Sequence, residues 1–251
     1  MLNTYIAGQI YAKILFETTF SQKKVIEMLS EWLTSPDYSQ IFVLNGYAGT
    51  GKTTLISALV EVLAEVGIKS VLLAPTGRAA KVLSQYSNRE AFTIHKKIYR
   101  EKTNADYESK FSLNINKEKG AVFVVDEASM LSDTTNEGQI FGSGSLLEDL
   151  IKYVRSGKEC RLILVGDNAQ LPPVGTDYSP ALDESVMQSY GDVVYASMDD
   201  VVRQSAESGI LFNATMLRCV LENGLYEIPQ FDMQYPDFKS IGGLDLLETL
   251  Q

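Results

Sequence analysis

The segment IFVLNGYAGTGKTT, residues 41–54, restricts the fold of this chain more than any other. A short apolar run leads into two glycines five positions apart, and Lys52, Thr53 and Thr54 follow. Glycines let backbone N–H groups turn inward around phosphate oxygens, because no Cβ obstructs the turn. The next residues predict a helix whose positive end faces the same phosphates. The pattern therefore predicts a strand, a phosphate-binding loop and a helix in direct succession.

Most positions of this loop and of the first helical turn are assigned to nucleotide binding. They are Gly46, Ala48, Gly49, Thr50, Gly51, Lys52, Thr53 and Thr54. Lys52 is expected to reach the β- and γ-phosphates of ATP, and the Thr53 hydroxyl is expected to ligate Mg²⁺. A strand–loop–helix turn that carries its glycines by chance is the alternative to a phosphate site.

Apolar runs alternate with segments of helical periodicity along the chain. Buried strands are expected at 41–45, 69–75, 121–129, 160–167 and 192–197, and helices at 21–34, 52–67 and 77–86. Ser21 is the expected N-cap of the first of these helices, and Gly67 closes the second. Strands that alternate with helices predict an α/β protein, with a parallel sheet and helices on both of its faces.

Two polar stretches interrupt this alternation. Residues from about 100 to 119 lack a clear period and are expected to form a small insertion. Residues 134–145 are rich in Gly and Ser, which predicts a mobile loop.

An acidic pair follows the third expected strand, in the stretch VFVVDEAS at 122–129. A phosphate-binding loop needs an acidic partner at the end of a neighbouring strand, and Asp126 is expected to hold Mg²⁺ through water. Glu127 is expected to orient or deprotonate the attacking water, which hydrolysis requires in addition to binding. Adjacent acids that only cap the end of a strand are the alternative.

The net charge of −10 argues by itself against a nucleic-acid partner, because phosphates favour basic surfaces. The charge is uneven, however. Residues 76–102 contain seven Lys and Arg against two Glu, a net of +5, whereas residues 183–251 contain three Lys and Arg against twelve Asp and Glu, a net of −9. Screening confines such fields to about 8 Å at physiological salt, so a local basic strip can still bind phosphates. A solvated helix face is the alternative role of this strip.

No apolar run approaches the ~18 residues of a membrane span, and the first residues lack a basic region followed by a clean apolar stretch. Cys160 and Cys219 lie far apart without metal-ligand spacing, so a buried, reduced pair is expected. These features predict a protein of the reducing cytoplasm with no membrane partner.

The stretch LILVGDNAQLPPVG, residues 162–175, points to a family. A strand followed by Gly-Asp-x-x-Gln-Leu-Pro-Pro-Val resembles motif III of superfamily 1 helicases. Together with LLAPTGRAAKVLS at 72–84 and AFTIHKKIY at 91–99, it resembles the RecD/Dda-type branch, which moves 5′-to-3′ along single-stranded DNA. The resemblance extends from about residue 18 to 224 and implies a P-loop NTPase with a RecA-like sheet.

The resemblance also implies roles for residues around the nucleotide. Gln22, in FSQKK, stands where the Q motif of the family reads adenine. Gln170 resembles the residue that senses the γ-phosphate and links it to DNA. Arg203, in DDVVRQS, resembles the motif IV arginine that reaches the γ-phosphate. A surface salt bridge of Arg203 with Asp199 or Glu207 is the alternative.

A second set of positions is implied to contact DNA. Pro75, Thr76 and Arg78 resemble motif Ia, in which backbone and short polar side chains touch DNA phosphates. Thr93 and His95 resemble the TIH contact of the family. A core or surface role is the alternative for His95, the only histidine. The basic strip coincides with these motifs, and the insertion near 100–119 stands where the family has its strand-splitting 1B element.

The expected organisation has three parts. Residues 1–35 form an N-terminal helical segment with the Q motif, residues 36–224 form the ATPase domain with its insertion, and residues 225–251 begin a second domain. Motifs V and VI of the family are not found in the sequence. The expectation is therefore an N-terminal motor domain that lacks its second RecA-like domain in cis, with the arginine finger that this domain would supply.

The resemblance implies an ATP- and Mg²⁺-dependent motor domain of a DNA helicase that acts on single-stranded DNA. A P-loop switch that binds nucleotide to control a protein partner is the alternative, favoured by the acidic surface and the short insertion. A nucleotide kinase is a third hypothesis, against which Glu127 and the motif around Gln170 argue.

Overall fold

The computed structural model describes residues 2–103, 109–133, 141–200, 208–222, 228 and 230–242. The chain divides into two compact units, Met1–Asp200 and Val201–Gln251. Arg203, expected at the γ-phosphate, lies outside the described residues. No helix within the described ranges is long and apolar enough to cross a membrane.

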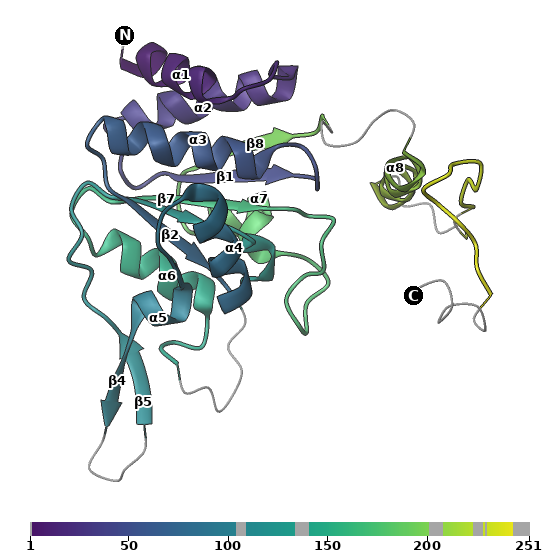
Figure 1. Ribbon diagram of the computed structural model, residues 1–251. Coiled ribbons are helices and arrows are strands. Elements are labelled where there is room, and N and C mark those ends of the chain that lie inside the picture. Colours follow the sequence, from purple (N-terminus) through teal and green to yellow (C-terminus); the bar gives the residue numbers. More distant parts are fainter. Residues whose placement is uncertain are drawn as a thin grey trace. The chain divides into compact units, whose positions relative to one another are not determined.

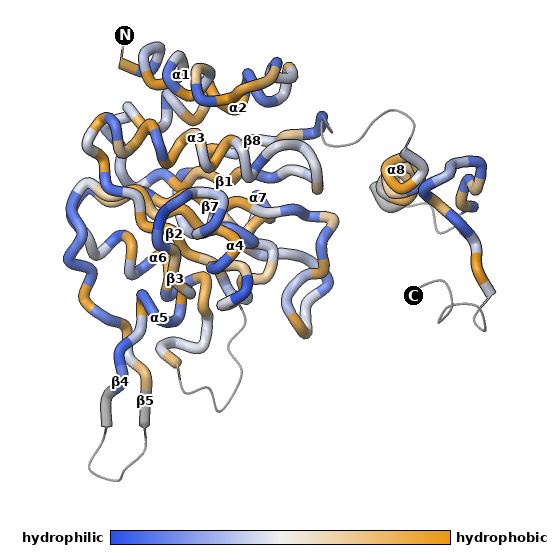
Figure 2. Tube along the Cα trace, in the orientation of Figure 1, coloured by the Kyte–Doolittle hydropathy of each residue, from blue (hydrophilic) through white to orange (hydrophobic). Residues whose placement is uncertain are grey.

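A parallel sheet forms the centre of the first unit (Figure 1). Within the described residues it has six strands in the order β3-β2-β6-β7-β1-β8, and every neighbouring pair is parallel. The strands are β1 (Ile41–Gly46), β2 (Ser70–Ala74), β3 (Ala91–Thr93), β6 (Val122–Val125), β7 (Arg161–Gly166) and β8 (Val193–Met198). Figure 2 shows that β1, β2 and β7 are largely apolar, as buried strands of parallel sheets are.

Helices cover both faces of this sheet. One face packs against α1 (Leu2–Lys13), α2 (Phe20–Thr34), α3 (Lys52–Glu65) and α4 (Gly77–Ser87), and the other against α5 (Ile94–Ile98), α6 (Leu146–Arg155) and α7 (Glu184–Gln188). Alternate residues of each strand point to opposite faces. In β1, Phe42 and Leu44 therefore enter the first core, and Ile41 and Val43 enter the second. The predicted α/β fold with helices on both faces is confirmed.

The predicted N-cap of α2 is wrong by two residues. Thr19, rather than Ser21, has extended backbone geometry and caps the helix, and its Oγ1 accepts from the Gln22 N–H at 3.3 Å. The Gln22 Oε1 atom in turn accepts from the Thr19 N–H at 3.0 Å, which completes a capping box. Ser21 lies inside the first turn, where its N–H and hydroxyl both donate to Asp200.

The ends of two predicted elements differ from expectation. The helix predicted to reach residue 67 ends at Glu65. Gly67 then adopts a φ of +75°, and the N–H groups of Gly67 and Ile68 donate to the Ala64 and Leu63 carbonyls, which is a Schellman ending. The strand predicted at 121–129 ends at Val125, because Glu127 adopts a left-handed φ of +55° and a 3₁₀ turn, η1, spans Ala128–Met130.

The expected insertion contains an antiparallel hairpin, which projects from the sheet in Figure 1. Its strands are β4 (Tyr99–Thr103) and β5 (Ser109–Leu113), and residues 104–108 between them are not described. The base of the hairpin is held by an aromatic cluster of His95, Tyr99, Phe111 and Phe141. The rings of Phe111 and Phe141 stack at 4.4 Å, and the Gly142 N–H donates to the Phe111 carbonyl at 2.8 Å. Residues 134–140 of the loop predicted to be mobile lie outside the described part.

The second unit contains α8 (Gly209–Glu222). Its first turn is held by Asp237 of the same unit, which accepts from the Ser208 hydroxyl at 2.7 Å and the Gly209 N–H at 2.8 Å. These contacts join α8 to the segment around Asp237 within this unit. The boundary near residue 224 that the sequence suggests stays a prediction.

The expectation of two buried cysteines is half wrong. Cys160 is buried beside β7, but Cys219 is exposed on α8. No disulfide joins these two described residues, as expected.

Stability should depend on pH through His95. Burial among the rings lowers the pKa of His95 below its ordinary value of 6.5, so the folded protein binds this proton less readily than the unfolded chain. The free energy of unfolding should therefore be highest above that value and should fall as the pH falls through about 6.5. The measurement is urea unfolding of the wild-type chain and of His95→Gln at several pH values from about 5.5 to 8.

Because the chain has one histidine, the variant isolates this effect. The His95→Gln protein should show a smaller loss of stability across the same pH range. An equal loss in both proteins would assign the pH dependence to the carboxylates instead.

Candidate functional site

Three strands bring the predicted nucleotide-binding residues to one edge of the sheet. In the parallel register, Asn45 of β1 pairs with Gly166 of β7, and Val125 of β6 pairs with Leu164 of β7. The phosphate loop after β1, the acidic pair after β6 and the motif after β7 therefore leave the sheet at the same, carboxyl edge. Ligands of open parallel sheets bind at this edge.

The glycines of the loop are needed for close packing. Gly49 and Gly51 have φ values of +82° and +94°, which side chains rarely adopt. A Cβ on Gly51 would lie 2.7 Å from Nε2 of Gln22, and a Cβ on Gly46 would lie 2.9 Å from the Met198 carbonyl. The Gln22 Nε2 atom donates to the Thr50 carbonyl at 2.9 Å, so the Q-motif glutamine is fixed against the loop. Its expected contact with adenine stays a prediction.

Lys52 lies at the first position of α3, and its side chain turns back over the loop. The ammonium donates to the Gly46 carbonyl and, at 2.8 Å, to the Tyr47 carbonyl. The buried Thr50 hydroxyl donates to the same Tyr47 carbonyl at 2.8 Å. Thr53 and Thr54 are half-buried in the first helical turn, and Ala48 is exposed at the loop. The loop thus holds a positive charge at the helix end where phosphate would bind.

The acidic residues converge on Glu127. Burial, the neighbouring Asp126 carboxylate and Asp167 raise the pKa of Glu127, whereas Lys52 and a hydrogen bond from the Gln170 side chain oppose the rise. The structure therefore brings Lys52, Asp126, Glu127 and Gln170 together, as the motifs predict. Asp167, buried at the end of β7, was given no role from the sequence, although it follows the strand within the motif that contains Gln170.

Sequence patterns also gave no sign of Tyr86 on α4. Its hydroxyl donates to Oδ2 of Asp126 at 2.5 Å, and Oδ1 of Asp126 accepts from the Glu127 N–H at 3.0 Å. Burial, followed by the charge of Asp126, raises the pKa of Tyr86, so the phenol keeps its proton and acts as the donor. Tyr86 is 40 residues from Asp126 along the chain, which hides this pair from any local motif.

These groups fit Mg²⁺ and a nucleoside triphosphate. Backbone N–H groups at a helix N-terminus and a lysine ammonium complement phosphate, and hydroxyl and carboxylate oxygens are the ligands that Mg²⁺ prefers. Gly46 and Gly51 leave no space for side chains where the loop is closely packed. Among the described residues no group of three or more His, Cys, Asp or Glu side chains forms a metal cage by itself. Such a site suits a cation that shares its shell with phosphate and water.

The predicted DNA-contacting residues lie at the neighbouring part of the same edge. In the register of β2 and β3, Ala74 pairs with Thr93, so Pro75 and Thr93 leave adjacent strands side by side. Thr76 and Thr93 are N-caps, accepting from the Ala79 and Lys96 N–H groups at 3.2 and 3.3 Å. The strand β3 that aligns them has three residues and was missing from the sequence prediction.

The side chains of this region differ in exposure. Thr76 and Arg78 are exposed, Pro75 and Thr93 are partly covered, and His95 is half-buried in the aromatic cluster. The basic strip is also divided. Its exposed members whose side chains are described are Arg78, Lys81, Arg89, Lys96 and Arg100. Lys97 is instead paired with Glu118 at 2.9 Å, which removes one charge from the strip.

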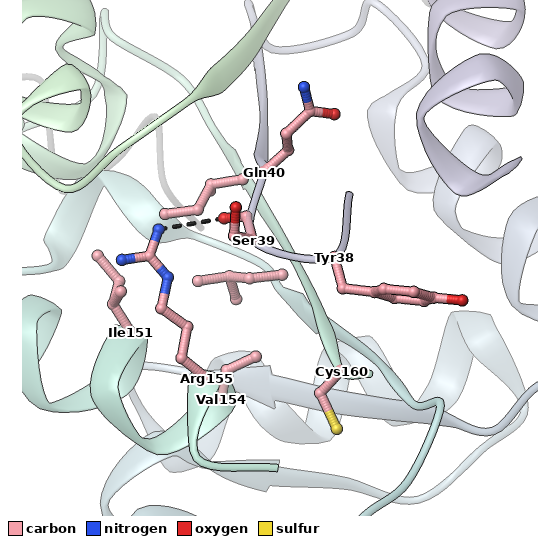
Figure 3. A pocket seen from close by; sticks show the side chains of 9 residues that line it. Tyr38, Ser39, Gln40, Ile151, Val154, Arg155 and Cys160 are labelled. Atoms are coloured by element: carbon pink, nitrogen blue, oxygen red, sulfur yellow. Dashed lines mark hydrogen bonds between the residues drawn. The ribbon is translucent and has the colours of Figure 1, made fainter. Parts of the chain in front are cut away.

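A pocket lies at the opposite, amino edge of the sheet (Figure 3). It is lined by residues that precede or begin β1 and β7, among them Tyr38, Gln40 and Cys160, and by Arg155 of α6. Arg155 donates across it to the Ser39 carbonyl at 3.1 Å. Parallel strands place this edge away from the phosphate loop, so the pocket is separate from the candidate site.

Comparison with known proteins gives the family. The AAA domain family matches residues 21–218. The ATP-dependent RecD2 DNA helicase of Deinococcus radiodurans is 31% identical over 143 residues, which cover 54% of this chain and 16% of the relative. The ATP-dependent DNA helicase dda of Enterobacteria phage T4 is 35% identical over 138 residues, which cover 52% of this chain and 28% of the relative.

A solved structure of Bacteroides sp Pif1 in complex with ADP-AlF4 is 19% identical with a TM-score of 0.49, over 80% of this chain and 46% of that chain. The chain spans less than a third of the length of the two curated relatives. The family match itself covers most of the chain. This protein therefore belongs to the AAA domain family, and it is similar in sequence to DNA helicases of the RecD and Dda type.

Proposed function

We propose that this chain is the ATP-binding and ATP-hydrolysing motor domain of a DNA helicase that acts on single-stranded DNA. One observation carries the proposal. Lys52, Asp126, Glu127 and Gln170 meet at one edge of the sheet. The motif Ia residues leave the same edge after β2, the strand next to β6, and the TIH residues leave it after β3, one strand further out.

The phosphates would lie against the loop between Gly46 and Lys52. Lys52 would exchange its loop carbonyls for phosphate oxygens, and Thr53 with Asp126 would hold Mg²⁺, the latter through water. Bound Mg²⁺ would neutralise part of the phosphate charge, so the attacking oxygen would be repelled less. Gln22 would lie beside the adenine of the nucleotide, because its side chain is fixed to the phosphate loop at Thr50.

Glu127 is the proposed general base. Its raised pKa makes it a stronger proton acceptor than an ordinary carboxylate. The Gln170 side chain donates a hydrogen bond to Glu127 and can bond water or phosphate instead. A residue that changes its hydrogen-bond partner in this way can report the loss of phosphate. Arg203 lies outside the described residues, and its role at the γ-phosphate is proposed from the family resemblance alone.

Single-stranded DNA is proposed to bind along Pro75, Thr76, Arg78, Thr93 and His95. The two capping threonines stand at helix N-termini, where N–H groups favour phosphate. The half-buried His95 is better suited to pack against the hairpin base than to carry charge. A P-loop switch that controls a protein partner remains the second candidate, because the protein carries a net charge of −10.

The helicase proposal includes a second RecA-like domain in cis that supplies an arginine finger. Such fingers are worth about 10³–10⁵ in turnover. The turnover of the 251-residue chain alone is therefore expected to be weak. Nucleotide binding, which depends on the loop, is expected to be intact.

Lys52→Ala should abolish binding of Mg-ATP, whereas Glu127→Gln should preserve binding and remove hydrolysis. The first change removes the phosphate-facing charge, and the second removes only the proton acceptor. Binding is measured with a fluorescent ATP analogue, and hydrolysis by phosphate release with and without a single-stranded oligonucleotide.

Lys158→Ala is the matched control for Lys52→Ala. Lys158 is exposed and precedes β7 at the amino edge of the sheet, away from the loop. It should bind and hydrolyse ATP as the wild-type chain does. Wild-type binding by Lys52→Ala would contradict the phosphate site.

Arg78→Ala should weaken binding of a single-stranded oligonucleotide at every salt concentration. If Arg78 contacts one phosphate, the slope of log affinity against log salt should become shallower by about 0.7. Fluorescence anisotropy over a salt series measures this slope, with Lys158→Ala again as the control. Oligonucleotide binding that is absent in the wild-type chain would favour the protein-directed switch.

A further inference from the structure

Tyr86 joins the proposed single-strand face to the acidic pair. It lies on α4, the helix that begins at the motif Ia residues Thr76 and Arg78. Its hydroxyl donates to Oδ2 of Asp126 at 2.5 Å. Its main-chain carbonyl accepts from the Ser57 hydroxyl of α3 at 2.9 Å. One residue thus contacts both the helix of the phosphate loop and the carboxylate that follows β6.

The Asp126 carboxylate is oriented from two sides. Oδ2 accepts from Tyr86, and Oδ1 accepts from the Glu127 N–H at 3.0 Å. A carboxylate oxygen has two acceptor directions, so each oxygen keeps one for another donor or a metal-bound water. The phenol therefore sets which direction remains available. Without it, one oxygen of the carboxylate would lose its donor.

Asp126 is also attached to α4 through the main chain. Its N–H donates to the Leu73 carbonyl at 3.0 Å, and Leu73 belongs to β2, the strand that leads into α4. Asp126 is thus joined to α4 twice, through the Tyr86 hydroxyl on the helix and through Leu73 on the strand that leads into the helix. Movement of α4 relative to the sheet would have to change the Tyr86 contact.

We propose that Tyr86 is a positioning residue that transmits single-strand binding on α4 to the Mg²⁺-binding carboxylate of Asp126. The inference rests on the function proposed above. A strand held at Thr76 and Arg78 would bias the position of α4, and Tyr86 would convert that bias into the orientation of Asp126. Coupling of this kind is reciprocal, so Mg-nucleotide should alter single-strand affinity by the same factor.

Tyr86→Phe tests the inference, because it removes one hydroxyl and keeps the ring. Binding of a fluorescent non-hydrolysable ATP analogue is measured against Mg²⁺ concentration, with and without a dT oligonucleotide. The variant should need about tenfold more Mg²⁺ for the same binding, the scale of one lost hydrogen bond to a charged group. Binding without Mg²⁺ should be unchanged. The oligonucleotide should shift nucleotide affinity in the wild-type chain and leave it nearly constant in the variant.

Tyr11→Phe is the matched control. It removes a phenolic hydrogen bond to the Lys23 carbonyl between α1 and α2, on the same face of the sheet. It should behave as the wild-type chain in every titration. Thermal unfolding of both variants checks that the fold is kept, and Ser57→Ala gives a second variant that loosens Tyr86 without removing its hydroxyl.

The outcomes separate the two proposals. A wild-type chain that binds no Mg-nucleotide would contradict the proposed function. A wild-type chain that binds it, but whose affinity ignores the oligonucleotide, would overturn the transmission. Wild-type Mg²⁺ dependence and coupling in Tyr86→Phe would overturn the role of Tyr86 alone.

Discussion

The parallel hydrogen-bond ladder through β6, β7 and β1 is the constraint on which the site depends. Parallel strands run in one direction, so each loop that follows a strand leaves at the same edge. Gly46, Asp126 and Asp167 each follow or end one of these strands, and they are far apart in the sequence. No contact between the side chains themselves is needed to gather them. The core residues that bury both faces of the sheet therefore also support the chemistry.

Gathering these groups has an electrostatic cost. Asp126, Glu127 and Asp167 repel one another where water is partly excluded, and the raised pKa of Glu127 reflects both effects. Lys52 is the positive charge that opposes this rise, and the Tyr86 phenol gives Asp126 a neutral donor. Repulsion between neighbouring carboxylates is typical of sites that bind a cation or whose charge changes during a reaction. Structural carboxylates such as Glu118 are instead paired directly with lysines.

Most of the central sheet could be predicted from the sequence, because buried parallel strands are short apolar runs with sharp polar ends. Lys52, Asp126 and Glu127 were predictable because loop spacing and an acidic pair follow such runs, whereas Gln170 was implied only by the resemblance around residues 162–175. Three features were not predictable. The three-residue β3 is too short for a periodic signal, the choice of Thr19 over Ser21 depends on backbone geometry, and the Tyr86 pair joins distant residues. Each is decided by tertiary contacts rather than local pattern.

The order of the strands places the acidic pair between the residues proposed to bind nucleotide and those proposed to bind DNA. β6 lies between β2 and β7, so Asp126 and Glu127 have the strand that leads to motif Ia on one side and the strand that leads to Gln170 on the other. The parallel ladder of β2 and β6 continues to Asp126, whose N–H donates to the Leu73 carbonyl. A shift of β2 relative to β6 would therefore act directly on the main chain of Asp126. A different order, with β6 at an edge, would leave the acidic pair in contact with only one of these two strands.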